Sequence, residues 1–522
     1  MTNTQFQVVD LFAGPGGLGE GFSSFKDKFK ILVSAEMEKS AHKTLMLRAY
    51  YRQLKSNAPE LLGDYYDYCN GISPDPVSER TEGYWKKALY EARQITLGSP
   101  EGNKELDDII DAELDPERPW VLIGGPPCQA YSLVGRARNK GKVGYSAHDD
   151  HRHFLYKEYL RIISRYRPTV FVMENVKGIL SSTVSGKRIF HDILEDLTSP
   201  DAASGKNENE RYVICSLTTG EVFRHDDSAS DFDVSKFIIR AENHGIPQAR
   251  HRVILLGIKE SLYSKVKMLR DKDRVSVRDV LSDLPPIRSK LSRQADSWES
   301  WQDAFVENLD SLLHELAADK SKLVDLAPEF TSLKTKMRSA LSAGMLRIEK
   351  DPLSSGQGRL DDWYNDPRLE VWLNHEARGH MVPDLKRYMF ASTFAQVYKT
   401  SPKGAVDFAL PGLRPNHKNW NSGKFADRFR VQVFDRPSTT ITSHIAKDGH
   451  YFIHPDPSQC RSFTVREAAR LQTFPDNYFF QGNRTQQFHQ VGNAVPPLLA
   501  HQIAEIVSSI LEGWQCGVTQ AQ

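Results

Sequence analysis

The sequence has few cysteines, no long uncharged apolar run and almost no net charge. Its 5 cysteines lie far apart in 522 residues and form no CxxC pair, so we expect neither a disulfide framework nor a bound metal. No apolar stretch predicts a membrane span, and the first residues lack the basic and apolar regions of a secretory signal. These absences favour a soluble protein of the reducing cytoplasm. The formal net charge of +1 by itself indicates no polyanionic partner.

Strand and helix signals alternate through the first half of the chain. The opening reads FQVVDLF, then AGPGGLGEGF, then KILVSAEME, which predicts a strand, a glycine loop leading into a helix, and a second strand. Further strands are predicted at WVLIGGPPC, PTVFVMENV, KFIIRAENHGIP and RHRVILLGI, with helical stretches between them. This alternation is typical of a doubly wound α/β domain with a parallel sheet.

The chain is longer than one hydrophobic core usually organises, so we expect more than one domain. The alternation stops after residue 258. We therefore predict a first domain at 1–258, a separate module at 259–435, and a return segment at 436–522 whose last helix packs on the sheet. Within the first domain, residues 41–117 read as mainly helical. Residues 185–235, rich in Ser, Asp, Asn and Glu, predict a mobile insertion.

Positive charge gathers in one part of the chain. Residues 377–450 contain 12 Lys and Arg against 5 Asp and Glu. Such a bias suits a surface that contacts phosphates, although an ordinary solvated face has the same composition.

A glycine loop follows the first predicted strand. Gly14, Gly16 and Gly19 form a GxGxxG pattern, and Glu36 ends the next strand 22 positions after Gly14. Glycines allow a phosphate or a nucleoside to approach the backbone, and a carboxylate at this place accepts ribose hydroxyls. The pattern fits a nicotinamide dinucleotide and S-adenosylmethionine equally well. A tight turn without any ligand is the third interpretation.

Cys128 follows two prolines at the end of the predicted strand WVLI, in GGPPCQAYS. Proline restricts its own backbone and that of the preceding residue, so the loop that holds this cysteine has few conformations. Such a loop suits a fixed nucleophile, and a small buried thiol in a turn is the alternative.

Other motifs accompany these two in a definite order. They are Glu174-Asn175 in VMENV, QARHR at residues 248–252, RPSTTIT from residue 436, and REAARLQTFP with QVGNAVPP near the end. In this order and spacing, the chain resembles the cytosine-C5 DNA methyltransferases. The resemblance implies a Rossmann-like methyltransferase domain, with a target recognition domain of mixed structure at 259–435 inserted before the return segment. No added reader domain or zinc cluster is visible, which favours the bacterial or phage restriction-modification type.

The resemblance implies covalent catalysis. Cytosine C5 is a poor nucleophile until a thiolate adds to C6, and Cys128 occupies the nucleophile position of the family. Glu174 would bind N3 and N4 of the cytosine, Arg252 would bind O2, and Arg250 would support the pocket or a loop. Taken alone, Glu174 reads equally as a carboxylate that caps a helix, and the arginines as surface charges.

The family pattern implies S-adenosylmethionine as the cofactor. Phe12 and the loop glycines would line its methionine end, Glu36 would hold the ribose, and Met37 would lie against the adenine. The complete set of predicted cofactor contacts is Phe12, Gly14, Gly16, Gly17, Glu36, Met37, Asp108, Ile109, Pro127, Leu155 and Asn493. The pattern ELDDIIDAEL allows a shift of one residue at Asp108 and Ile109.

Duplex DNA is the implied partner. The target cytosine must be flipped out of the stack, and a glycine-rich basic loop after Cys128 would close over it. The predicted DNA contacts are Ser132, Arg136, Arg138, Gln248 and Thr440. Base readout is expected from polar side chains between residues 377 and 442. Glu467 and Arg470 are expected to form buried polar links, and Phe463, Leu471 and Phe474 to lie in the core.

Two other functions use the same motifs. A transfer RNA cytosine methyltransferase shares the catalytic residues, but its recognition region is smaller. A catalytically silent DNA-binding homologue would keep the fold, and intact Cys128, Glu174 and Arg252 argue against it. The interpretation as a DNA methyltransferase implies a monomer at the nucleoid, with a restriction endonuclease of the same specificity as a partner.

Overall fold

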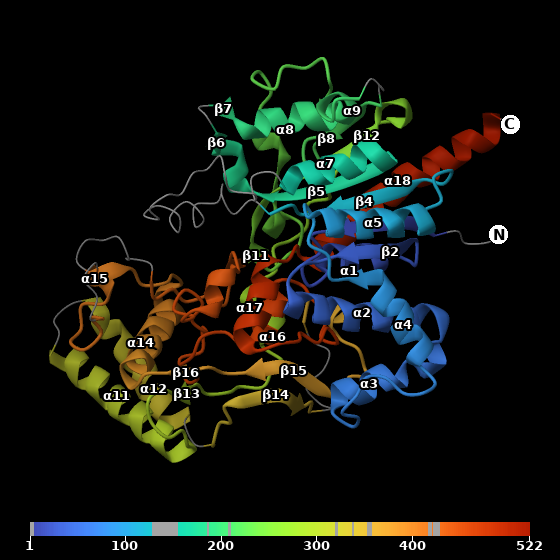
Figure 1. Cartoon of the computed structure of the whole chain (residues 1–522). Helices are drawn as coiled ribbons and strands as arrows, with labels where there is room; N and C mark the ends of the chain where they lie inside the picture. Colours follow the sequence, from blue (N-terminus) through green and yellow to red (C-terminus); the bar gives the residue numbers. More distant parts are fainter. Residues whose placement is uncertain are drawn as a thin grey trace.

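The computed structural model describes residues 5–127, 155–184, 187–206, 210–318, 322–336, 339–351, 358–415, 420 and 428–521. These residues form a sheet-centred body, at the top of Figure 1, and a second body of helices and short strands at the lower left. The segment that follows the second body returns to the sheet and ends in the long helix α18 (Pro497–Ala521).

A nine-stranded sheet runs through the first body in the order β3-β2-β1-β4-β5-β12-β8-β9, with β10 paired to β12. The strands from β3 to β5 are parallel, whereas β12 lies antiparallel to β5 and to β8. The strand order reverses between β1 and β4, where open α/β sheets bind ligands. The strands are β1 (Phe6–Leu11), β2 (Phe29–Ala35), β3 (Ala92–Arg93), β4 (Trp120–Gly124), β5 (Val170–Val176), β8 (Tyr212–Cys215), β9 (Val222–Phe223), β10 (Ile238–Arg240) and β12 (His251–Lys259).

Helices cover both faces of the sheet, so its central strands are buried throughout. Val9 and Leu11 share one core with α5 (Pro100–Glu113), α7 (Leu155–Tyr166) and α8 (Ile189–Thr198). Val8 points to the opposite core, which is closed by α1 (Gly17–Ser23) and α18. Strands covered in this way have no polar face, and every residue of β1 and β4 is buried. The predicted doubly wound α/β fold is confirmed.

Residues 41–117 are largely helical, as predicted. Helices α2 (Lys39–Asn57), α3 (Gly63–Asn70), α4 (Glu82–Glu91) and α5 occupy this stretch. The first three form a core of their own that also takes in Leu369, Val371, Leu373 and Phe479. The helical extension therefore joins the sheet domain to later parts of the chain.

The prediction of an insertion at 185–235 is wrong for most of that stretch. Residues 189–198 form α8, and β8 pairs with β12 inside the main sheet, with Val213 and Ile214 fully buried. The polar residues that suggested an insertion lie in the connections between these elements. The remaining short elements here are α9 (Pro200–Ala203), β6 (Thr183–Val184) and β7 (Lys187–Arg188).

The second body combines helices with two-stranded sheets. Its longest helices, α11 (Trp298–Ala318) and α14 (Val382–Tyr398), share one core that also includes Ile453 and Cys460. A further core combines residues 275–284 with residues 441–494, so side chains from both sides of position 435 pack together. The boundary at 435 stays a prediction. The other elements are α10 (Val277–Leu281), β13 (Lys290–Leu291), α12 (Ala327–Lys336), β14 (Gly344–Glu349), α13 (Asp361–Tyr364), β15 (Val371–Glu376), β16 (Gly379–His380), α15 (Gly404–Asp407), β11 (Gln248–Ala249), β17 (Ser438–Thr439), α16 (Val465–Leu471) and α17 (Arg484–Asn493).

Buried ion pairs stabilise the return segment. Glu467 bonds Arg461 at 2.6 Å, and Arg470 bonds Asp476 at 2.7 Å and Asp283 at 2.5 Å. The link to Asp283 crosses from the return segment to α10, so the structural role predicted for Glu467 and Arg470 is confirmed. The predicted core residues Phe463, Leu471 and Phe474 are also buried.

One helical stretch, Arg484–Trp514, is apolar and long enough to cross a membrane by composition. Its most apolar window is 72% buried inside the structure, as in the core helix of a soluble protein.

Candidate active site

Several of the predicted site residues lie at one edge of the sheet. The carboxyl ends of parallel strands meet there, so the residues after β1, β2, β4 and β5 become neighbours. These are the glycine loop after β1, Glu36 after β2 and Gly125 to Pro127 after β4, with Glu174 two residues before the end of β5.

The glycine loop is open on one side and closed on the other. Gly14 and Gly16 adopt φ of 58° and 98°, which favours glycine. A Cβ on Gly14 would meet no atom within 4 Å, which leaves room for a ligand. A Cβ on Gly17 would lie 2.2 Å from the carbonyl oxygen of Val495, so glycine is required where the return segment crosses α1.

Glu36 is already oriented without a ligand. Its carboxylate accepts hydrogen bonds from the backbone N–H of Gly14 at 2.8 Å and of Glu38 at 2.7 Å. Burial raises the pKa of Glu36, and these hydrogen bonds oppose that rise. The next side chain, Met37, is 59% exposed.

The structure corrects the prediction for Asp108 and Ile109. Asp108 lies more than two turns into α5, about 12 Å from its start, with an exposed carboxylate paired to Lys104. Ile109 is buried in the core under the sheet. Gln94 instead stands at the edge, where its side chain donates to the carbonyl of Met37 at 3.4 Å.

Both ends of the chain build this edge. Asn493 ends α17, and the Tyr478 hydroxyl donates to the carbonyl of Pro15 in the glycine loop. Leu155 begins α7 beside Gly98, 3.4 Å from a Cβ placed there. Val495, two residues after Asn493, packs on Gly17 of the loop, and Pro127 follows β4. The roles of Asn493, Leu155 and Pro127 as cofactor contacts stay predictions.

Glu174 and Arg252 form an ion pair next to this edge. Strands β5 and β12 are antiparallel, and Arg252 is registered opposite Val176, two residues beyond Glu174. Arg252 Nε lies 2.9 Å from Glu174 Oε1, and the side chains are only 14% and 12% exposed. Burial lowers the pKa of Arg252, while the Glu174 carboxylate counteracts this shift. The pair therefore presents two oriented polar groups in a site with little water.

The loop after β4 approaches this pair closely. A Cβ on Gly125 would lie 3.1 Å from Glu174 Oε2, so a glycine gives the loop its path. Asn175 donates from Nδ2 to the carbonyl of Pro126 at 3.4 Å and accepts from the Val176 N–H at 2.8 Å. Asn175 was not predicted as a positioning residue. Cys128, Ser132, Arg136 and Arg138 lie outside the described residues.

Arg250 and Gln248 are both buried, and their side chains form hydrogen bonds within the protein. Arg250 is 2% exposed and donates to the carbonyls of Ile441 at 2.9 Å and Gly492 at 3.3 Å, so it cannot touch a base as it stands. Burial and the neighbouring Arg252 lower its pKa. Gln248 is fully buried with its amide bonded inside the protein, which corrects its prediction as a DNA contact. Thr440 is half-buried and donates to the carbonyl of Ala249 at 2.7 Å.

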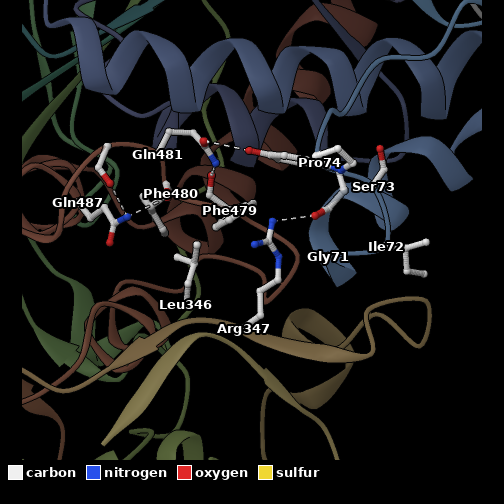
Figure 2. Close-up of a pocket in the computed structure, with 12 residues that line it drawn as sticks. Gly71, Ile72, Ser73, Pro74, Leu346, Arg347, Phe479, Phe480, Gln481 and Gln487 are labelled. Carbon is white, nitrogen blue, oxygen red and sulfur yellow. Dashed lines mark hydrogen bonds between the residues drawn. The ribbon is translucent and has the colours of Figure 1, made fainter.

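A separate pocket of about 400 Å³ lies where the end of α3, strand β14 and residues 479–482 meet. Figure 2 shows Arg347 between these segments, where it donates to the carbonyls of Tyr68 and Cys69. Its guanidinium also lies over the rings of Tyr68 and Phe479. This pocket lies at the contact between three segments of the chain, and none of the predicted site residues lines it. Among the described residues, no group of three or more His, Cys, Asp or Glu could hold a metal.

Comparisons with known proteins agree with this geometry. The model of the family described as C-5 cytosine-specific DNA methylase matches residues 69–201 and 221–509. The type II methyltransferase M.Bpa9945I of Bacillus paralicheniformis is 34% identical, over 97% of this chain and 99% of the relative. The type II methyltransferase M.AgeI of Thalassovita gelatinovora is 26% identical, over 96% of this chain and 99% of the relative.

The fold has a matching solved structure. A candidate DNA modification methyltransferase encoded within a prophage of E. coli superposes with a TM-score of 0.50 and 19% identity, over 97% of this chain and 100% of that one. The family indicated by the ordered motifs is thus confirmed. The chain belongs to the C-5 cytosine-specific DNA methylase family and is a DNA (cytosine-5-)-methyltransferase.

Proposed function

We propose that this enzyme methylates C5 of a cytosine flipped out of duplex DNA, with S-adenosylmethionine as donor and Cys128 as the nucleophile that adds to C6. The observation that carries the proposal is the buried Glu174–Arg252 ion pair, 2.9 Å apart, against the Gly125–Pro127 loop that leads into Cys128.

The sheet edge fits the cofactor. Open space in front of Gly14 supports binding of the methionine end near Phe12, Gly16 and Gly17. The oriented Glu36 carboxylate would accept the ribose hydroxyls, and the exposed Met37 side chain would cover the adenine. Bound S-adenosylmethionine supplies an electrophilic methyl group on a sulfonium. Pro127, Leu155 and Asn493 would complete the pocket.

Glu174 and Arg252 would activate the base. Addition of a thiolate to C6 moves negative charge toward N3 and O2 of cytosine. The carboxyl group of Glu174 would donate its O–H proton to N3 and accept a hydrogen bond from the N4 amino group, and Arg252 would donate to O2. Both would thereby stabilise that charge and select cytosine over thymine. Because the two side chains are already buried and paired, little reorganisation would be needed when the base arrives.

Duplex DNA would be recognised by the second body. The excess of positive charge at 377–450 and the position of Thr440 beside β11 support this assignment. Ser132, Arg136 and Arg138, in the loop after Cys128, would contact the same DNA from the first domain. We assign residues 259–435 as the target recognition domain. The names of the relatives as type II methyltransferases support a restriction-modification role in the cytoplasm, with an endonuclease of the same specificity as partner.

Methylation sequencing at single-base resolution tests the proposal. The intact chain and a Cys128→Ser variant are expressed in a host without cytosine methylation. We expect one short motif methylated at cytosine C5 with the intact chain and none with the variant. An unmethylated genome, from soluble protein that binds the cofactor, would overturn DNA as the substrate, and transfer RNA would then be assayed. Normal methylation by Cys128→Ser would overturn the covalent mechanism.

A further inference from the structure

The turn that carries Thr440 touches the end of the helix that carries Asn493. A Cβ added to Gly492 would lie 2.3 Å from the backbone nitrogen of Ser443, so the two backbones are in direct contact. Thr440 is on the DNA side of this contact and Asn493 on the cofactor side, in the assignments proposed above. The segments that carry the two ligand sites are therefore packed directly against each other.

Two buried glutamines connect the same two segments through side-chain hydrogen bonds. Gln248 Oε1 accepts from the N–H of Ile441 at 2.8 Å, and Gln248 Nε2 donates to Gln472 Oε1 at 2.8 Å. Gln472 Nε2 then donates to the carbonyls of Val491 at 2.7 Å and Ala494 at 3.1 Å. Both side chains are fully buried. A continuous chain of side-chain hydrogen bonds thus joins the peptide after Thr440 to the peptides on both sides of Asn493.

Arg250 makes a second connection between the same two points. Its guanidinium donates to the carbonyls of Ile441 and Gly492. Ile441 is therefore held through its N–H by Gln248 and through its carbonyl by Arg250, while the end of α17 is held by Gln472 and Arg250. Buried hydrogen bonds of this kind are costly to leave unpaired, so a shift at one end must be accommodated at the other.

We propose that Gln248, Arg250 and Gln472 are positioning residues that couple cofactor binding at Asn493 to the conformation of the DNA-contacting turn at 440–446. The proposal rests on the proposed function for the assignment of these two sites. Cofactor that orders Asn493 would also order the Ile441 peptide, and DNA at the turn would in return strengthen cofactor binding, because coupling between two sites is reciprocal.

Hydrogen exchange of the full-length chain tests the coupling without any substitution or DNA. Binding of S-adenosylhomocysteine is first measured by calorimetry, and exchange is then compared with and without it. We expect amide exchange of peptides covering 438–446 to slow by about 5-fold or more. Bound S-adenosylhomocysteine with unchanged exchange at 438–446 would overturn the coupling alone. Failure of S-adenosylhomocysteine to bind would overturn the proposed cofactor and the coupling with it.

Two matched variants test whether the hydrogen bonds of Gln472 carry the coupling. Gln472→Met removes the hydrogen bonds of the link at nearly constant volume, and Gln502→Met removes one buried glutamine bond, to the carbonyl of His244, outside it. Gln472→Met should bind S-adenosylhomocysteine within about 3-fold of the intact chain yet show less slowing at 438–446 than the intact chain, because only the Arg250 connection remains. Gln502→Met should retain the full slowing. Slowing in Gln472→Met as large as in the intact chain would overturn its assigned role. The measurement on the intact chain stands even if this variant does not fold.

Discussion

The side chain of Asn175 donates a hydrogen bond to the carbonyl of Pro126, two residues before Cys128, and the neighbouring residue Glu174 forms the ion pair with Arg252. Consecutive residues of β5 therefore serve two different parts of the site. One positions the loop that leads to the nucleophile, and the other presents the carboxylate that would bind the base.

Asn175→Ala should slow catalysis while leaving cofactor binding intact. Loss of the bond to Pro126 frees the loop, and a displacement of the nucleophile by about 1 Å can cost up to roughly 100-fold in rate. The measurement is the rate of covalent adduct formation with duplex DNA containing 5-fluorocytosine, beside the affinity for S-adenosylhomocysteine. Asn308→Ala is the control, because Asn308 donates to a backbone carbonyl, that of Val382, far from the site. Equal adduct rates in both variants would contradict the positioning role.

Glu174→Gln should lower kcat by about 100- to 10,000-fold, because a neutral amide cannot supply the proton or stabilise the charge that develops on the ring. Affinity for S-adenosylhomocysteine should change little. Methyl transfer is measured with tritiated S-adenosylmethionine. The control, Glu210→Gln, removes a carboxylate that pairs at 3.3 Å with Lys259, at the opposite end of β12 from Arg252. Near-normal kcat in Glu174→Gln would rule out its assigned part in base activation.

Met37→Ala should raise the KM for S-adenosylmethionine by about 10-fold, since loss of one apolar contact of roughly 1.4 kcal/mol has that effect. Asp108→Ala should leave this KM within about 2-fold, because its carboxylate pairs with Lys104 at the surface of α5. Steady-state kinetics at saturating DNA separate the two. A larger rise of the KM in the Asp108 variant than in the Met37 variant would contradict the assignment of the adenine to Met37.

Buried histidines predict a loss of stability in acid. Burial lowers the pKa of His375 and His454 to about 4, and that of His380 and His450 below its usual value. In the unfolded chain these rings take up protons below about pH 6.5. The free energy of unfolding should therefore fall as the pH drops from 6.5 toward 4. Asp10, Glu36 and Asp196 act in the opposite direction, since burial raises the pKa of Asp10 to about 8 and the pKa values of Glu36 and Asp196 above their usual range, but they are three groups against four.

Urea unfolding at pH 7.0 and pH 5.0 measures this effect. We expect a lower midpoint at pH 5.0, and a smaller difference between the two midpoints in His375→Gln. His191→Gln, at the surface of α8, should keep the full difference. A midpoint at pH 5.0 equal to or above that at pH 7.0 would contradict the argument.

The parts of the site that follow regular strands could be predicted from the sequence. Glu36 and the glycine loop lie at strand ends, so their spacing indicated that they would meet. Gln94 could not be predicted in this way, because β3 has only two residues and shows no strand pattern in the sequence. The acidic run around Asp108 matched the family pattern instead. Gln248 is a polar residue in a polar motif, and only its contacts with residues more than 190 positions away show that it is internal.

The contacts of Tyr478 with Pro15 and of Val495 with Gly17 also bear on biosynthesis. The glycine loop and the segment that packs on it are more than 460 residues apart in the sequence. A nascent chain therefore cannot complete its cofactor pocket before residue 478 has been translated. Incomplete products that stop before this residue would lack both contacts, so we expect no methylation activity from them.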